Sequence, residues 1–293
     1  MEKYKIIIFL IILLNYNQNI FGQSLNELKK YEGIWIAKDY YNSFLKTKSA
    51  ILSRKAFSPD NPVGLRININ EYDKSTNLLN IGFSLLHDHL LHPEVSMYII
   101  NGKDTISEQG SFRIKIDTKL NKYDYVINGK YIYDWNYLRF NNDTTLSLYN
   151  IKGDTINYVR FKTKFKKNYN YPNPLYCFTR EIVLKGKYIL KDSLGNIITN
   201  KFEILENGKV KSKSIFDNYT VYYSTDIYCG PRTQEDFIMF VDNILIENSD
   251  YKGFAIKLIN KNKIQLFERI WYTTEKGADT YRLSDIKYEL WKK

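Results

Sequence analysis

The chain contains few of the side chains on which most metal centres and covalent catalysts depend. Its 293 residues include only three histidines and two cysteines. Neither a Gly-x-Ser-x-Gly nucleophile motif nor a His-Glu-x-x-His zinc motif occurs. These absences argue against the common serine hydrolases and zinc peptidases. The sequence therefore points to no catalytic residue and no cofactor, and it does not predict an enzyme.

Long apolar runs are also missing, apart from one at the N-terminus. Residues 6–14 (IIIFLIILL) follow Lys3 and Lys5 and precede a polar stretch, which is the pattern of an export signal. The run is too short to span a bilayer, and no later stretch is long and apolar enough to be a membrane helix. No cysteine is present here to carry a lipid. We expect a signal peptide at 1–23 and a secreted or periplasmic protein without an integral membrane segment.

The two cysteines, Cys177 and Cys229, both lie in the part of the chain that would be exported. An oxidising compartment favours their pairing, and an even count leaves no odd thiol. We therefore predict a disulfide between them, which would stabilise the fold by about 4 kcal/mol in the chain-entropy model. The alternative is a pair of separately buried thiols.

The formal net charge of +11 raises the question of an anionic partner. A basic surface attracts nucleic acids, anionic lipids and acidic glycans. However, the positive charges are scattered, and the densest cluster is short, at 162–167 (KTKFKK). We predict no nucleic-acid partner.

Two short helices are expected near the start of the mature chain. Residues 24–33 combine capping-box spacing with apolar residues every third position, and Gly33 ends this pattern. A strand then begins at GIWIAK. Residues 39–49 are typical of a second helix, with Asp39 as the N-cap residue.

Beyond this point the pattern changes to short alternating runs separated by turns. Residues 65–70 (LRININ) and 111–117 (SFRIKID) each place apolar side chains at every second position. Asn-Gly and related pairs, which tolerate the positive φ of tight hairpins, recur between such runs. Many hairpin-connected strands predict an antiparallel barrel or sandwich.

The chain also shows signs of an internal duplication. The polar, proline-containing segment 166–176 is typical of a linker. Residues 137–165 and 255–293 on either side both follow a strand, turn, strand, turn, strand pattern, and YEGIWIAKD resembles LKGKYILKD. We therefore predict one domain at 24–165 and a second, more divergent one at 177–293, each large enough for its own core.

At Gly33, Ile34 and Trp35 the sequence resembles a known family. A short helix that leads into Gly-x-Trp on the first strand, before an antiparallel meander, resembles the lipocalin and fatty-acid-binding-protein superfamily, the calycins. It is also similar to secreted lipocalin-like proteins of Gram-negative bacteria. The resemblance implies an all-β fold of up-and-down β-barrels, two in tandem, with short capping helices. It also implies that a cation from the last strand covers the Trp35 ring, and Arg160 is the candidate; Tyr188 stands where the second unit would have this Trp.

A barrel of this kind implies a cavity for one small hydrophobic or amphipathic molecule. The helix at 39–49 would then turn one face toward the ligand, and that face consists of Tyr40, Tyr41, Phe44 and Leu45. The same pattern is explained by simple packing of the helix on the barrel.

All three histidines lie within six positions, at His87, His89 and His92. On a strand, His87 and His89 point the same way about 7 Å apart, a spacing that metal sites use. His92 supplies a third ligand if the chain turns there. The alternative is a short helix or loop with the imidazoles in solvent.

Three functions follow from these observations. The first is an exported, non-enzymatic binding protein that holds a small hydrophobic or amphipathic ligand in a barrel cavity. The second is a surface interaction module with filled barrels, whose tyrosines contact a glycan or a protein. The third is a metal-dependent hydrolase that uses the histidine cluster.

Overall fold

The structure is a computed structural model of the 293-residue chain. It describes residues 29–58, 61–73, 78–84, 86, 97–100, 112–117, 122–125, 135–150, 154–163, 173–224, 235–242, 251–275, 277 and 279–293. Within these residues, none of the helices has both the length and the apolar character needed to cross a membrane.

The described residues form two compact units, and the chain contributes to each unit more than once. Unit 1 comprises those within Met1–Trp35, Leu65–Gly82 and Val95–Lys164. Unit 2 comprises those within Ile36–Gly64, Phe83–Glu94 and Phe165–Lys293. The helical segment that follows the first strand, which we expected in the N-terminal domain, therefore belongs to unit 2.

The fold is all-β with a few short helices, as predicted. The described strands of the first sheet are β1 (Gly33–Ala37), β2 (Gly64–Asp73), β3 (Leu78–Ser84), β4 (Met97–Ile100), β5 (Phe112–Asp117), β6 (Lys122–Tyr125), β7 (Trp135–Asn142), β8 (Thr145–Asn150) and β9 (Thr155–Phe161). Those of the second sheet are β10 (Gly186–Asp192), β11 (Ile197–Ile204), β12 (Val210–Lys211), β13 (Thr220–Ser224), β14 (Asp236–Val241), β15 (Tyr251–Asn260), β16 (Lys263–Thr273) and β17 (Asp279–Lys292).

The two sheets share one topological feature, which is that the first strand lies between the second and the last. The nine-stranded sheet has the order β6-β5-β4-β3-β2-β1-β9-β8-β7, with one parallel pair, β4 and β5. The eight-stranded sheet has the order β12-β11-β10-β17-β16-β15-β14-β13. The predicted three-strand endings are present as β7-β8-β9 and β15-β16-β17.

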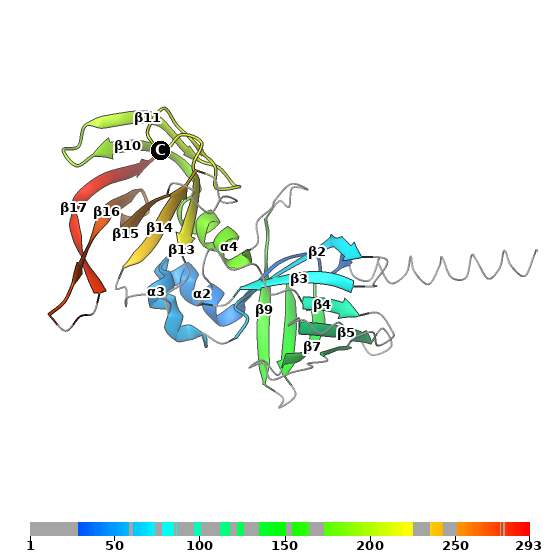
Figure 1. Cartoon of the computed structure of the whole chain (residues 1–293). Helices are drawn as coiled ribbons and strands as arrows, with labels where there is room; N and C mark the ends of the chain where they lie inside the picture. Colours follow the sequence, from blue (N-terminus) through cyan, green and yellow to red (C-terminus); the bar gives the residue numbers. More distant parts are fainter. Residues whose placement is uncertain are drawn as a thin grey trace, which may run out of the picture. The chain divides into compact units, whose positions relative to one another are not determined.

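The sheet of unit 2 curls, as Figure 1 shows for β10 to β17. Its edge strands approach each other at one point. Lys209 and Thr220 form an isolated antiparallel bridge, and the Val221 amide donates to the Gly208 carbonyl at 2.9 Å. The curl gives this sheet a concave inner side on which apolar side chains gather.

Aromatic rings fill the inner side of the unit 2 sheet. Phe216 lies 4.4 Å from Phe240, 5.9 Å from Phe254 and 5.4 Å from Tyr288, measured between ring centroids. Phe202 adds edge contacts to the same group at 6.2 and 6.5 Å. Rings packed at these separations leave protein, not solvent, at the centre of the unit.

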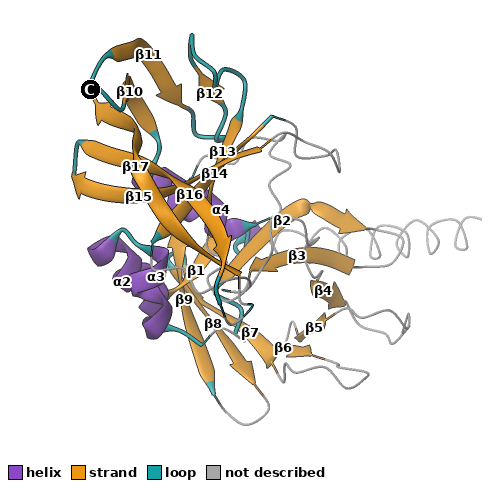
Figure 2. Cartoon of the chain, turned by 60° about the vertical axis from the view of Figure 1, so that its left-hand side comes forward, coloured by secondary structure: helices purple, strands orange, loops and turns teal. Residues whose placement is uncertain are grey.

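The helices of unit 2 are α2 (Lys38–Thr47), α3 (Ala50–Ser53), the 3-10 turn η1 (Arg54–Ala56) and α4 (Pro174–Val183). Figure 2 shows α2 and α3 side by side. The predicted N-cap at Asp39 is wrong, because the helix begins at Lys38 and Ala37 occupies the cap position. Asp39 instead lies in the first turn, where its negative charge complements the helix dipole.

The helix α4 begins inside the segment that we interpreted as a linker. The Asn173 side chain accepts hydrogen bonds from the Leu175 and Tyr176 amides at 2.9 and 3.4 Å. Pro174 follows at the first helical position, where its fixed φ is favourable. The Asn-Pro pair that indicated a loop is therefore a helix start.

Candidate functional site

The Gly-x-Trp corner of unit 1 has the geometry that the family resemblance implied. Trp35 is fully buried, and its indole Nε1 donates to the Tyr31 carbonyl at 2.7 Å. The Arg160 guanidinium carbon lies 4.4 Å from the Trp35 ring centroid, so the predicted cation–ring contact is present. Arg160 also donates to the Lys30 carbonyl. Both side chains hold the N-terminal turn on the sheet.

Electrostatics at this corner also indicate a structural role. Burial lowers the pKa of Arg160, while the carboxylates of Asp143 and Glu32 act in the opposite direction. Arginine remains protonated under all ordinary conditions, so Arg160 cannot exchange a proton in a reaction. The corner therefore stabilises the fold of unit 1, and Arg160 does not act as an acid or a base.

The predicted cap helix, α2, packs on other elements of unit 2. Tyr40 and Phe44 are fully buried. The Phe44 ring lies 5.2 Å from Phe178 of α4 and 5.8 Å from Tyr223 of β13. Tyr41 and Leu45 are half-buried, and the Tyr41 ring stacks on Phe178 at 5.2 Å. These contacts are those of helix packing, and ligand contact by this helix stays a prediction.

A partly buried carboxylate, that of Asp236, lies at the start of α3. The Asp236 Oδ1 accepts hydrogen bonds from the Ala50 and Ile51 amides at 2.8 and 3.2 Å. Burial raises the pKa of Asp236, although hydrogen bonds from Ser49, Ile51, Tyr223 and Ala50 act against that shift. Burial, with a smaller contribution from Asp236, also raises the pKa of Tyr40.

A buried acid with a raised pKa is a common feature of catalytic sites. In this case the carboxylate is already used, because it satisfies two amides at the start of α3. The Tyr40 hydroxyl has no hydrogen-bond partner among the described residues. The cluster anchors α3 to β14, and a reaction there would need a substrate to displace a helix.

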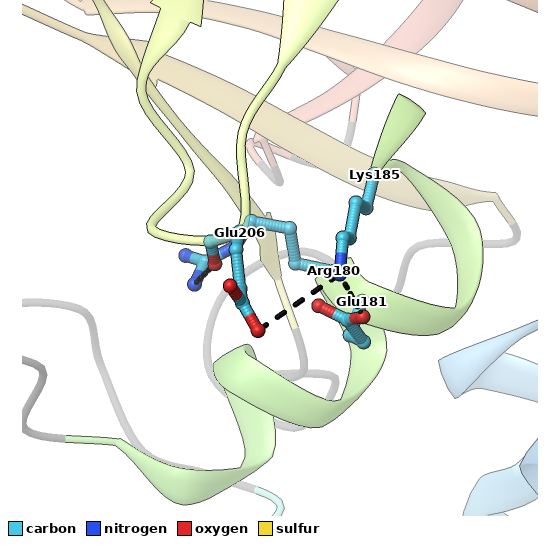
Figure 3. Close-up of polar contacts among 4 residues, drawn as sticks. All are labelled: Arg180, Glu181, Lys185 and Glu206. Atoms are coloured by element: carbon cyan, nitrogen blue, oxygen red, sulfur yellow. Dashed lines mark hydrogen bonds and ion pairs between the residues drawn. The ribbon is translucent and has the colours of Figure 1, made fainter. Parts of the chain in front are cut away.

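A second anchor joins α4 to the turn between β11 and β12. The buried Arg180 donates through Nη2 to the Glu206 carbonyl at 2.9 Å. Lys185 pairs with Glu181 and lies 3.9 Å from a Glu206 carboxylate oxygen, as Figure 3 shows. These contacts tie the helix to the sheet edge, and each cation has a protein partner.

The hairpin of β16 and β17 carries several exposed apolar side chains. The strand β15 pairs with β16 only as far as Phe267, and β10 pairs with β17 only from Tyr288 onward. Among the described strands, residues 269–273 and 279–283 therefore pair only with each other. We call this two-stranded ribbon the arm, and Figure 1 shows it reaching beyond the rest of its sheet.

Large apolar side chains are exposed on the arm. Ile270 is 42% exposed, Trp271 is 54% exposed and Tyr272 is 50% exposed. Ile270, Trp271 and Tyr272 could not be singled out from the sequence, because three consecutive apolar residues are also typical of a strand that is buried on both faces. The strand lengths were the available signal: β16 and β17 are longer than the strands that flank them.

The remaining predicted residues are placed as follows. His87, His89 and His92 lie outside the described residues, so the metal site stays a prediction. The part of the chain that the structure describes contains no group of three or more His, Cys, Asp or Glu side chains that could hold a metal ion. Cys177 lies half-buried in α4, whereas Cys229 is outside the described ranges, and their pairing also stays a prediction.

No protein-family model matches the sequence, and no curated protein is similar enough to count as a relative. The antiparallel sheets and the half-barrel curl are compatible with the calycin resemblance at the level of architecture.

Proposed function

We propose that this protein is an exported, non-enzymatic binding protein that recognises its partner with its surface, through the arm of unit 2. The observation that carries the proposal is a contrast within that unit. Aromatic rings fill the inner side of the sheet, while Trp271 and its neighbours on the arm are exposed.

The filled interior favours surface recognition over ligand carriage in unit 2. A carrier needs an enclosed space bounded by inward side chains. Here the inward positions hold rings in mutual contact, including Phe216, Phe240 and Phe254. A hydrophobic ligand would have to separate these rings, and close-packed cores resist insertion of additional groups.

The composition of the arm favours a binding role for it. Tryptophan and tyrosine are enriched where proteins meet partners, because each offers a large contact area at a low cost in conformational entropy. The arm exposes one of each at adjacent positions of β16. About half of each of these two side chains is exposed, so burial on folding does not account for them in full.

Ligand carriage and metal-dependent hydrolysis stay predictions from the sequence. Carriage finds no support in the contacts of unit 2, and the hydrolase depends on histidines outside the described residues. Neither prediction is supported by a described contact, so surface recognition is the function that the geometry favours.

The proposal is tested by comparing two matched variants for binding to immobilised cell-surface material of the protein's own host. One variant, Ile270→Ser/Trp271→Ser/Tyr272→Ser, removes the apolar surface of the arm. The control, Leu194→Ser, removes an exposed apolar side chain from the β10–β11 turn, where Leu194 is 85% exposed. We expect binding to fall about tenfold or more in the arm variant and to be unchanged in the control.

Two results would contradict the proposal. One is equal binding by the arm variant and the wild-type protein, with circular dichroism showing that both are folded. The other is a stoichiometric apolar ligand retained by the wild-type protein in native mass spectrometry, which would revive ligand carriage.

A further inference from the structure

We propose that one face of the arm, which we call the Trp271 face, binds a neutral oligosaccharide. This inference rests on the proposed function and names its ligand class. Residues that are directly paired in an antiparallel ribbon lie on the same face, and faces alternate along each strand. The pairs Trp271–Tyr281 and Arg269–Leu283 therefore share the Trp271 face, and Ile270, Tyr272, Thr280 and Arg282 lie on the opposite face.

The Trp271 face is a ladder of groups in contact, which joins two cation–ring contacts to one edge-to-face contact between rings. The Arg269 guanidinium carbon lies 3.7 Å from the Phe237 ring centroid on one side and 4.6 Å from the Tyr281 centroid on the other. The Trp271 ring then contacts Tyr281 at 5.4 Å. The ladder runs from β14 outward and ends at an indole that is 54% exposed.

Hydrogen bonding fixes the middle of this ladder. The Tyr281 hydroxyl donates to the Glu235 Oε2 at 3.0 Å, so the phenol is held both by its ring contacts and by its polar end. Side chains that are already ordered lose less conformational entropy when a ligand binds. The neighbouring indole therefore rests on a rigid support.

The chemistry of this face matches that of a sugar. A pyranose ring presents a face of C–H groups, which carry a small positive charge and pack on the negative face of an aromatic ring. Its hydroxyl groups need hydrogen-bond partners at the same time. A carboxylate has about four acceptor positions, so Glu235 can accept from a sugar hydroxyl in addition to Tyr281.

Charge balance favours a neutral sugar over an acidic one. Among the described side chains of this face, Arg269 is a cation and Glu235 is an anion, and the two interact electrostatically. An acidic glycan on this face would be repelled by the Glu235 carboxylate, which accepts the hydrogen bond of the Tyr281 hydroxyl. Attraction of acidic glycans to the chain as a whole, from its net charge of +11, would be unspecific and screened by salt.

The size of the face favours a sugar over a protein. Five residues of paired strand measure about 17 Å in length, and two strands are about 10 Å wide, which gives about 170 Å². A stable protein interface buries about 800 Å² on each partner. The Trp271 face is therefore too small to hold a protein by itself, and it is well matched to a few sugar rings laid along the ribbon.

The experiment measures binding of the full mature chain to soluble neutral polysaccharides, namely a β-glucan, an α-glucan, a xylan and a mannan, by affinity electrophoresis and calorimetry. Chondroitin sulfate serves as the acidic comparison, at low and high salt. We expect at least one neutral polysaccharide to bind independently of salt. Trp271→Ala should weaken that binding about tenfold or more, and Glu235→Gln should weaken it several-fold.

Arg282→Ala is the control on the same ribbon, since Arg282 is exposed on the opposite face. Binding should be unchanged in this variant. The inference is wrong if no neutral polysaccharide binds, if Trp271→Ala binds normally, or if Arg282→Ala has the larger effect. If only chondroitin sulfate binds, and salt abolishes it, net charge explains the binding and the inference fails.

Failure of this inference is distinguishable from failure of the proposed function. If the triple arm variant loses binding to host cell-surface material while no neutral polysaccharide binds, surface recognition stands and the sugar assignment falls. A protein partner on the opposite face then becomes the better explanation. If the arm variant also binds normally, both proposals fail.

Discussion

The two units build the same corner from different side chains. In unit 1 Gly33 has a φ of 140°, and in unit 2 Gly186 has a φ of 149°. Two residues later, Trp35 and Tyr188 are both buried, and each donates a hydrogen bond of 2.7 Å to the carbonyl four residues before it. This correspondence supports the proposed duplication, which rested on a weak similarity of sequence.

The corners differ in how a cation of the last strand is used. In unit 1, Arg160 lies over the Trp35 ring and donates to the Lys30 carbonyl. In unit 2 the corresponding strand places Lys292 opposite Tyr188, and its Cε lies 3.0 Å from the position that a Cβ on Gly186 would take. An indole binds its carbonyl through the ring edge and leaves a face for a guanidinium. We infer that the corner of unit 1 depends more strongly on its cation.

The largest effect should come from removing the aromatic ring of unit 1. Trp35→Ala should destabilise unit 1 by about 3–5 kcal/mol, because it deletes a fully buried ring and its hydrogen bond. Hydrogen exchange followed by mass spectrometry reads the two units separately through their peptides. We expect lost protection in peptides of β1, β8 and β9.

The exposed Trp271 provides the control for this change. Trp271→Ala removes the same side chain from the surface and should alter stability by less than about 0.5 kcal/mol. A loss below about 1 kcal/mol for Trp35→Ala would show that the corner of unit 1 does not hold its sheet.

The next largest effect should come from replacing the corner glycines, Gly33 and Gly186, with alanine. Each has a φ that side chains rarely adopt, so Gly33→Ala and Gly186→Ala should each cost about 1–3 kcal/mol. The cost should be greater at Gly186, because an added Cβ meets Lys292 at 3.0 Å, whereas at Gly33 the nearest atom is 3.9 Å away. Urea denaturation with unit-resolved hydrogen exchange measures both.

A double variant separates crowding from backbone strain in unit 2. Adding Lys292→Ala to Gly186→Ala removes the crowding and leaves the strain. The double variant should therefore recover to the level of Gly33→Ala, and no recovery would mean that strain accounts for the whole cost.

A smaller effect should follow from removing each cation. Arg160→Met should cost about 2 kcal/mol, since it removes a cation–ring contact and a charged hydrogen bond to a carbonyl. Lys292→Met should cost less than about 0.5 kcal/mol, because Lys292 is exposed. Thermal unfolding of both variants tests the comparison, and equal losses would contradict the difference between the corners.

The sequence predicted features that depend on local pattern or on the topology of a meander. Of the predicted strands, residues 65–70 lie in β2 and residues 112–117 form β5. The contact between Trp35 and Arg160 spans 125 positions, yet it follows once the first and last strands are neighbours. The family resemblance supplied the prediction that these two strands are neighbours.

Features that depend on distant contacts were not predictable in this way. The helices α2 and α3 belong to unit 2 because Asp236 and Phe178 hold them, and the Ala50–Asp236 hydrogen bond joins residues 186 positions apart. A helical pattern shows which face is buried and not what buries it. The arm was missed for a related reason, since the consecutive apolar residues Ile270, Trp271 and Tyr272 are equally compatible with a strand buried on both faces of a sheet.

The smallest expected effect is a pH dependence of the stability of unit 2, which contains Asp236. Burial raises the pKa of Asp236 above its ordinary value of 3.8. A carboxyl pKa that is higher in the folded state than in the unfolded state stabilises the fold at low pH. This stabilisation is complete at pH values below 3.8, and it is lost as the pH rises through the higher pKa of the folded state. Asp236→Asn keeps an oxygen for the Ala50 and Ile51 amides and removes the charge. The variant should therefore stabilise unit 2 at pH 7 and leave it unchanged near pH 3, as measured by urea unfolding across this range. Peptides of unit 1 serve as the internal control, and a loss of stability at pH 7 would mean that the ionised carboxylate holds α3 better than the amide does.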